Sequence, residues 1–248
     1  MNIVLIHGAW HGGWVWDRLV PLLEQQGHRV VAPSLTGCGE RSAEATPEVT
    51  LETHVADVID VLDGLPDGES AVLVGHSYGG MVIAGVAELR SHQLDALLYL
   101  DAFCPEDGEY CFTFIPPEHQ AWFRQLAIDE GDGWRLPPTE QLLDLWGLHD
   151  ERDRQWAWER LTDSSLPCFE SAVRAPQRRF ASLPRTYVVA AADDYPLRPV
   201  FEPIVNRLRD DGCEIVEVPT GHEIMVQAPE KVAELLNQLT RERLGDSG

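Results

Sequence analysis

A serine flanked by glycines is the strongest candidate for chemistry in this sequence. The segment Gly75-His76-Ser77-Tyr78-Gly79 follows the apolar run 71–74 and precedes a helical pattern of apolar residues. In this context the serine lies on a sharp turn from a strand into a helix, where its neighbouring glycines avoid steric clashes. The ordinary alternative is a buried serine in a glycine-rich turn. The strand before it and the helix after it favour Ser77 as a nucleophile.

A serine hydroxyl needs a base that removes its proton and an acid that orients this base. With a nucleophile of this type, the acid and then the histidine follow the serine along the chain. The last of the nine histidines, His222, lies between the expected last strand and last helix, so it is the predicted base. Asp193 and Asp194 both follow the preceding strand, and Asp101, at the end of an earlier strand, is a third candidate acid. The spacing does not choose between Asp193 and Asp194.

Attack on a carbonyl carbon also requires amide groups that stabilise the oxyanion. The first apolar run ends in His7-Gly8-Ala9, a turn typical of the loop that supplies one such amide. We therefore expect the backbone N–H groups of Ala9 and Tyr78 to be the donors. His7 and His11 are four residues apart, as metal ligands often are, but no third ligand follows at a suitable spacing. The sequence thus predicts neither a metal nor a cofactor.

Alternating strand and helix patterns must position these residues. Short apolar runs predict strands at 2–6, 29–32, 71–75, 96–100, 185–190 and 214–218. Most of these runs are continuous, as in strands that are covered on both faces. Between them, apolar residues recur at the spacing of amphipathic helices. The patterns predict an α/β fold with a mostly parallel sheet of about six strands flanked by helices.

The region from about 104 to 183 breaks this alternation, because it has amphipathic helical pieces but no convincing strands. We expect a single domain over 1–248, with a core at 1–103 and 184–248 and this region as a helical cap. Five of the eight tryptophans lie in the cap, where their rings either line an apolar pocket or pack the cap against the core. The candidate pocket residues are Gly8, His11, Trp122, Trp134 and Trp146.

Composition excludes several classes of partner. The chain has 41 acidic and 19 basic residues, a net charge of −22, which opposes binding to nucleic acid or to an anionic membrane. The five scattered cysteines form no CxxC motif, so no disulfide framework or structural zinc is predicted. No apolar run is long enough for a membrane span, and the N-terminus lacks the features of a secretion signal. We expect a reduced, cytoplasmic protein.

The sequence resembles the α/β-hydrolases of the plant methylesterase and hydroxynitrile lyase group and their bacterial esterase-like relatives. The resemblance rests on the segments His7-Gly8-Ala9-Trp10-His11-Gly12-Gly13-Trp14, Gly75-His76-Ser77-Tyr78-Gly79-Gly80-Met81 and Gly221-His222, and on residues 99–108. It implies an α/β-hydrolase fold with a helical cap over the active site. The acid of this family lies in a Thr-Glu-Asp-Lys-like segment after the penultimate strand. The resemblance thereby places the acid at Asp193, and Asp194, in the place of the lysine, stays the alternative.

The resemblance also separates two chemistries. Hydroxynitrile lyases of this group carry a threonine after the first-strand histidine and a lysine directly after the catalytic histidine, where this chain has Gly8 and Glu223. A lysine would stabilise departing cyanide, whereas a glutamate would repel it. The serine nucleophile, Ser77, also differs from the aspartate of haloalkane dehalogenases and epoxide hydrolases.

The resulting expectation is a serine esterase that cleaves a small neutral ester, of an aromatic or apolar acid, through an acyl-enzyme. Its expected partner is this small-molecule substrate, and a homodimer is left open. Two alternatives remain from other classes. One is a hydroxynitrile lyase-like, C–C bond-cleaving or biosynthetic tailoring enzyme with the same triad, and the other is a ligand-binding protein with slow turnover.

Overall fold

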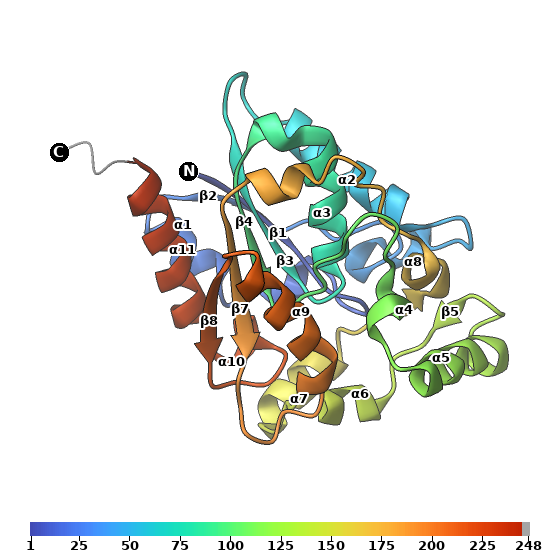
Figure 1. The fold of residues 1–248 in the computed structure, drawn as a ribbon. Helices are drawn as coiled ribbons and strands as arrows, with labels where there is room; N and C mark the ends of the chain where they lie inside the picture. Colours follow the sequence, from blue (N-terminus) through green and yellow to red (C-terminus); the bar gives the residue numbers. More distant parts are fainter. Residues whose placement is uncertain (245–248) are drawn as a thin grey trace.

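Six parallel strands form the centre of the molecule (Figure 1). The structure is a computed structural model that describes the backbone of residues 1–244 and the side chains of residues 1–239. In spatial order the strands are β2 (Arg29–Val31), β1 (Asn2–Ile6), β3 (Ala71–His76), β4 (Leu94–Leu100), β7 (Arg185–Ala190) and β8 (Glu214–Val218). Every neighbouring pair is parallel, so the predicted α/β fold with a mostly parallel sheet is confirmed.

Helices cover both faces of this sheet (Figure 1). On one face lie α1 (Val20–Gln25) and α11 (Pro229–Leu244), and on the other lie α2 (Leu51–Asp63), α3 (Gly79–Arg90) and α9 (Arg198–Asp210). All residues of β1 and β3 are buried, which explains why these strands are apolar without alternation. Helix α3 is buried along its whole length up to Glu88, because it lies between the sheet and α2.

Short helices of one or two turns lie between the longer elements of the core. They are η1 (Gly13–Trp16), η2 (Gly39–Glu44), η3 (Ser91–Gln93) and α10 (Ile224–Gln227). The loops after β1, β3, β4, β7 and β8 all leave the sheet at the carboxyl ends of the strands. In a parallel sheet these ends lie along one edge, where residues that are distant in sequence meet.

The segment 104–183 connects β4 to β7, and its middle part lies beyond the carboxyl ends of β7 and β8 (Figure 1). It contains α4 (Cys111–Phe114), α5 (Pro117–Glu130), α6 (Glu140–Leu145), α7 (Glu151–Trp158), α8 (Leu166–Glu170) and η4 (Arg179–Ser182). One expectation is corrected, because the segment also holds a short antiparallel pair, β5 (Arg135–Leu136) with β6 (Ser164–Ser165). Strands of two residues are too short to give an alternating pattern in the sequence.

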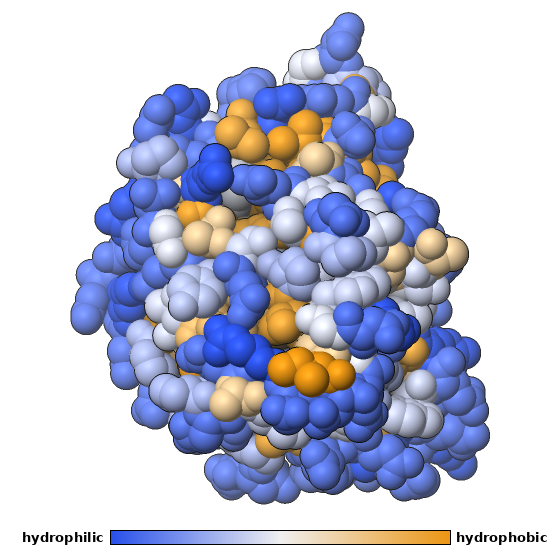
Figure 2. Space-filling view, turned by 90° about the vertical axis from the view of Figure 1, so that its right-hand side faces the viewer, coloured by the Kyte–Doolittle hydropathy of each residue, from blue (hydrophilic) through white to orange (hydrophobic). Residues whose placement is uncertain are grey.

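The face that Figure 2 presents is mostly hydrophilic, in keeping with the acidic composition, and hydrophobic residues form several patches between the hydrophilic ones. Among the described helices, none combines the length and the apolar character needed to cross a membrane.

Candidate active site

Ser77 lies on the turn between β3 and α3, as the sequence predicts. Its φ of +52° is in the left-handed region that residues other than glycine rarely adopt. Strand β4 and the loop after it hold this conformation, because the N–H of Ser77 donates to the carbonyl of Leu100 and the N–H of Phe103 donates to the carbonyl of Ser77. A Cβ at Gly79 would lie 2.5 Å from the carbonyl oxygen of Ile6, so this position of the turn requires glycine.

The loop after β1 packs directly against the turn that carries the nucleophile. A Cβ at Gly8 would lie 2.8 Å from the Cβ of Ser77, so the close approach of the two loops depends on the missing side chain. The ring of His7 fixes this loop, because its Nδ1–H donates to the carbonyl of Gly8 (2.7 Å) and its Nε2 accepts from the N–H of Leu35 (3.0 Å). Burial lowers the pKa of His7 to about 3. His7 is therefore a neutral structural residue.

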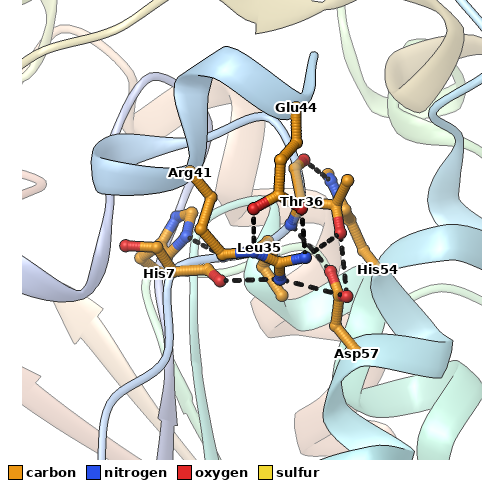
Figure 3. Close-up of polar contacts among 8 residues, drawn as sticks. His7, Leu35, Thr36, Arg41, Glu44, His54 and Asp57 are labelled. Atoms are coloured by element: carbon orange, nitrogen blue, oxygen red, sulfur yellow. Dashed lines mark hydrogen bonds and ion pairs between the residues drawn. The ribbon is translucent and has the colours of Figure 1, made fainter. Parts of the chain in front are cut away.

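A second network holds the ring of Tyr78, the residue after the nucleophile. Figure 3 shows the part of this network that Thr36, His54 and Asp57 form. The Nε2–H of His54 donates to the carbonyl of Thr36 (2.9 Å), which leaves its Nδ1 to accept from the hydroxyl of Tyr78 (2.9 Å). Asp57 accepts two hydrogen bonds from Thr36 and one from Arg41. This network fixes the ring of Tyr78, which is the N-cap residue of α3.

His222 lies in the loop between β8 and α10, and its partner is Asp101. The Nδ1 of His222 is 2.7 Å from Oδ2 of Asp101, and the two residues are 2% and 0% exposed. Asp101 directly follows β4 and has a φ of +42°. Its own N–H donates to the carbonyl of Val188, and its Oδ1 accepts from the N–H of Ala190, so β7 fixes both its backbone and its side chain. This contact sets the tautomer of His222 that leaves Nε2 free to act as a base.

The expectation that Asp193 orients His222 is corrected by this geometry, and so is the alternative Asp194. Both residues are exposed, and Asp194 pairs with His149 at 3.2 Å. The physical reason is the course of the chain after β7. The N–H of Ala192 donates to the carbonyl of Thr220, which holds the chain beside the loop after β8, and the next two side chains then point to solvent. Asp101, the third candidate from the sequence, takes the place beside His222.

Tyr195 is the residue of the loop after β7 that points inward. Its hydroxyl donates to Oδ2 of Asp101 (2.5 Å) and lies 3.1 Å from Nδ1 of His222. Burial and the negative charge of Asp101 raise the pKa of Tyr195 well above its usual value. The hydroxyl therefore stays protonated and donates to the carboxylate. No motif in the sequence marks this tyrosine, which follows the two exposed aspartates directly.

We expect Tyr195→Phe to change the pH dependence of the reaction. Loss of this donor leaves more negative charge on Asp101, which then stabilises the protonated imidazole of His222 more strongly. The acid limb of the profile of kcat/KM against pH should move to higher pH, with a loss of kcat of about 10-fold or less. Tyr187→Phe is the matched control, because its buried hydroxyl donates to the carbonyl of Ala102 instead. Identical profiles for wild type and Tyr195→Phe would contradict this role.

Ser77 and His222 open onto one cavity of about 290 Å³. Ala9 and Tyr78, whose amides are the expected oxyanion donors, line the same cavity. The remaining lining is mostly apolar and comes from the loops after β1, β4 and β7, the segment 104–183 and α9. It comprises Trp10, Phe103, Ile115, His119, Trp122, Phe123, Gln141, Leu142, Leu145, Trp146, Phe169, Leu197, Val200 and Phe201.

Two of the five pocket candidates, Trp122 and Trp146, line this cavity, and the other three lie elsewhere. Gly8 is buried against the turn of the nucleophile, and His11 is buried in a polar cluster. Trp134 lines separate surface hollows near the loop after β2, because the short β5–β6 pair carries it away from the cavity. The expectation is corrected for these three.

Several aromatic residues of the cavity have no distinguishing sequence signal. Trp10 stands between the rings of Phe123, Trp146 and Phe169, at centroid distances of 5.9, 6.2 and 5.6 Å. Its indole N–H donates to the carbonyl of Leu136, which joins the loop after β1 to the segment 104–183. The composition of that segment indicates aromatic rings, but only the packing determines which of them face the cavity.

A second polar cluster lies behind the cavity. One nitrogen each of His11 and His76 and an oxygen of Glu223 lie within 4.8 Å of one another, and all three residues are buried. The sequence spacing around His7 and His11 shows no third ligand, whereas the fold brings His76 and Glu223 to His11 from other elements. Such a set of donors can hold a positive charge, either a proton or a metal ion.

The chain is similar over nearly its whole length to known hydrolases. The model of the Alpha/beta hydrolase family matches residues 3–235. The chain is 36% identical over 249 residues to a carbendazim hydrolyzing esterase from Nocardioides sp. (strain SG-4G), covering 96% of this chain and 99% of that protein. It is 37% identical over 208 residues to salicylic acid-binding protein 2 from Nicotiana tabacum, covering 77% of this chain and 79% of that protein.

Solved structures show the same fold. An extracellular alpha/beta-hydrolase from a Paenibacillus species, described as sharing structural and functional homology with tobacco salicylic acid-binding protein 2, gives a TM-score of 0.81 at 25% identity. The match covers 96% of this chain and 98% of that chain. A pyrethroid hydrolase from Sphingobium faniae JZ-2 gives a TM-score of 0.73 at 25% identity and covers 96% of both chains.

Proposed function

Because the chain belongs to the alpha/beta hydrolase family and is a carboxylic ester hydrolase, we propose that it is a serine esterase with Ser77, His222 and Asp101 as its triad. The observation that carries this proposal is the buried contact between Nδ1 of His222 and Oδ2 of Asp101, at 2.7 Å, behind a cavity onto which Ser77 opens. An oriented base and a nucleophile at one apolar pocket are what acyl transfer through a serine requires, and this geometry supports the proposal.

The proposed reaction has two steps. His222 takes the hydroxyl proton of Ser77 through Nε2, and Oγ attacks the ester carbonyl carbon while the amides of Ala9 and Tyr78 stabilise the oxyanion. The imidazolium then gives its proton to the leaving alcohol, and an acyl-enzyme results. In the second step His222 activates a water molecule that releases the acid. Asp101 stabilises the imidazolium in both steps.

The cavity supports a small, neutral and apolar or aromatic substrate. Its volume of about 290 Å³ lies at the lower end of the range for small-molecule sites, about 300–1,000 Å³. Its few polar side chains beyond the triad, His119 and Gln141, are exposed at its rim. An anionic group buried among the rings would lose its hydration without gaining a cationic partner.

The charge preference is tested with two aryl methyl esters, one of which carries an additional carboxylate. Methyl benzoate and the monomethyl ester of terephthalic acid share the scissile group, and we expect kcat/KM to be at least about 10-fold higher for the neutral ester. Aryl methyl esters, short-chain acetyl esters and carbendazim, which the Nocardioides relative hydrolyses by its name, complete the panel. Equal rates for both members of the pair, or a preference for long-chain lipid esters, would contradict the proposal.

The geometry disfavours the lyase alternative. The residue that follows His222 is Glu223, which is 1% exposed. Burial would raise the pKa of Glu223, but the neighbouring His11 lowers it to about 2, so the side chain is an anion. A carboxylate in this place supplies no positive charge that would stabilise departing cyanide. Product analysis separates hydrolysis from lyase chemistry, and a single burst without further turnover would indicate a ligand-binding protein.

A further inference from the structure

The cluster behind the cavity joins the three loops that carry the proposed catalytic groups. His11 lies in the loop after β1 that carries Ala9, which we call the oxyanion loop. His76 directly precedes Ser77, and Glu223 directly follows His222. Nε2 of His11 lies 3.4 Å from Oε2 of Glu223. The exposed fractions of His11, His76 and Glu223 are 1%, 0% and 1%, and the rings of Trp14 and Trp146 pack against His11.

Backbone carbonyls determine which imidazole nitrogens carry hydrogen. Nδ1 of His11 is 2.7 Å from the carbonyl of Ala9, and Nε2 of His76 is 3.2 Å from the carbonyl of His222. A carbonyl only accepts, so each of these nitrogens is a donor. If both rings were neutral, their other nitrogens would each present a lone pair to the cluster. Nε2 of His11, Nδ1 of His76 and both oxygens of Glu223 have no hydrogen-bond partner among the described residues.

Two lone pairs and a carboxylate that converge in a buried space require a positive charge. Burial lowers the pKa of His76 well below its usual value, so this ring is the less favourable site for the proton. His11 is the nearer partner of Glu223. The other titratable groups that face the pair are His7 at the end of β1, His222 after β8 and Tyr195 after β7.

We propose that His11 is an imidazolium that forms a buried ion pair with Glu223, and that this pair positions His222 relative to the oxyanion loop. The pair is bonded both to the oxyanion loop and to His222. The Nδ1–H of His11 donates to the carbonyl of Ala9, and Glu223 is covalently joined to His222. His11 and Glu223 are thus positioning residues, and their effect on the reaction rests on the proposed function.

The protonation of His11 is tested without any measurement of activity. Protein labelled with ¹⁵N-histidine is observed at pH 8 by long-range ¹H–¹⁵N correlation, with His11 assigned by the loss of its signals in His11→Gln. Exposed imidazoles are neutral at this pH, because their ordinary pKa is about 6.5. We expect both ring nitrogens of His11 to be protonated in wild type and the ring to be neutral in Glu223→Gln. A neutral His11 in wild type would overturn the proposal even if the enzyme is an active serine esterase.

The positioning role is tested by kinetics on methyl benzoate. Glu223→Gln keeps the shape of the side chain and removes its charge, and we expect kcat to fall by about 10-fold or more while KM stays within about 2-fold. His11→Gln should have a similar effect, and the double variant should be little worse than either single variant, because both remove the same interaction. Multiplicative losses in the double variant would contradict the pair.

Glu88→Gln is the matched control for loss of a buried carboxylate. Glu88 is 8% exposed and accepts from the N–H groups of Gln177 and Arg179, at 2.9 Å each, away from the cavity. We expect a lower Tm for Glu88→Gln without a change in kcat. If Glu88→Gln lost as much kcat as Glu223→Gln, the effect of Glu223 would be one of general stability, and the positioning role would be contradicted. A metal ion retained at one per chain after dialysis against EDTA would identify the positive charge as a bound cation and overturn the assignment of a proton.

Discussion

Ser77→Ala is expected to lower kcat for a chromogenic short-chain ester by about 10⁶-fold, since removal of the nucleophile from a triad leaves only binding and oxyanion stabilisation. Alanine keeps the Cβ that the turn accommodates and removes only Oγ. The strained turn at φ +52° is held by backbone hydrogen bonds with β4 and the loop after it. The fold should therefore persist, and the melting temperature checks this.

Covalent labelling with a fluorophosphonate probe tests directly whether Ser77 is the reactive serine. Wild-type protein should be labelled at Ser77, as located by peptide mass spectrometry, and Ser77→Ala should not be labelled. Ser34→Ala is the matched control, because Ser34 is 2% exposed and its hydroxyl is bonded to Glu40 outside the cavity. Hydrolysis by Ser77→Ala above about 1% of the wild-type rate would contradict a serine nucleophile.

The second large effect separates the two acids. Asp101→Asn should lower kcat by about 10⁴-fold, because an amide in place of the carboxylate favours the wrong tautomer of the histidine and no longer stabilises the imidazolium. Asp193→Asn should leave kcat within about 2-fold, as expected for an exposed loop residue. Hydrolysis of methyl benzoate by the two variants gives the comparison, with the Tm of each as a check on folding.

The reverse result has a clear meaning. A large loss in Asp193→Asn with little change in Asp101→Asn would return the acid to the loop after β7, where the resemblance to the methylesterase group places it. The geometry predicts the opposite, because Asp101 accepts hydrogen bonds from His222, Tyr195 and the N–H of Ala190. An asparagine could accept from some of these donors but would carry no charge to stabilise the imidazolium.

The sequence determined the local features of this protein. Continuous apolar runs such as 71–74 and 187–190 form strands because both faces of the sheet are covered, and this requirement is visible in each run by itself. The turn that carries Ser77 is likewise marked in the local sequence. Its glycines are required because a side chain at these positions would clash with neighbouring backbone, as in any such strand–turn–helix connection. The position of His222 after the last strand follows from the same order of elements.

Only the tertiary structure decided which groups meet. Asp101 and Asp193 both follow strands of the same sheet, and the choice between them depends on hydrogen bonds of Ala192 and on the inward ring of Tyr195. The rings that line the cavity, and the pairing of His11 with Glu223, join residues from different loops and helices. Such contacts have no sequence periodicity, because they arise from the course of loops at one edge of a sheet, where neighbours in space are far apart along the chain.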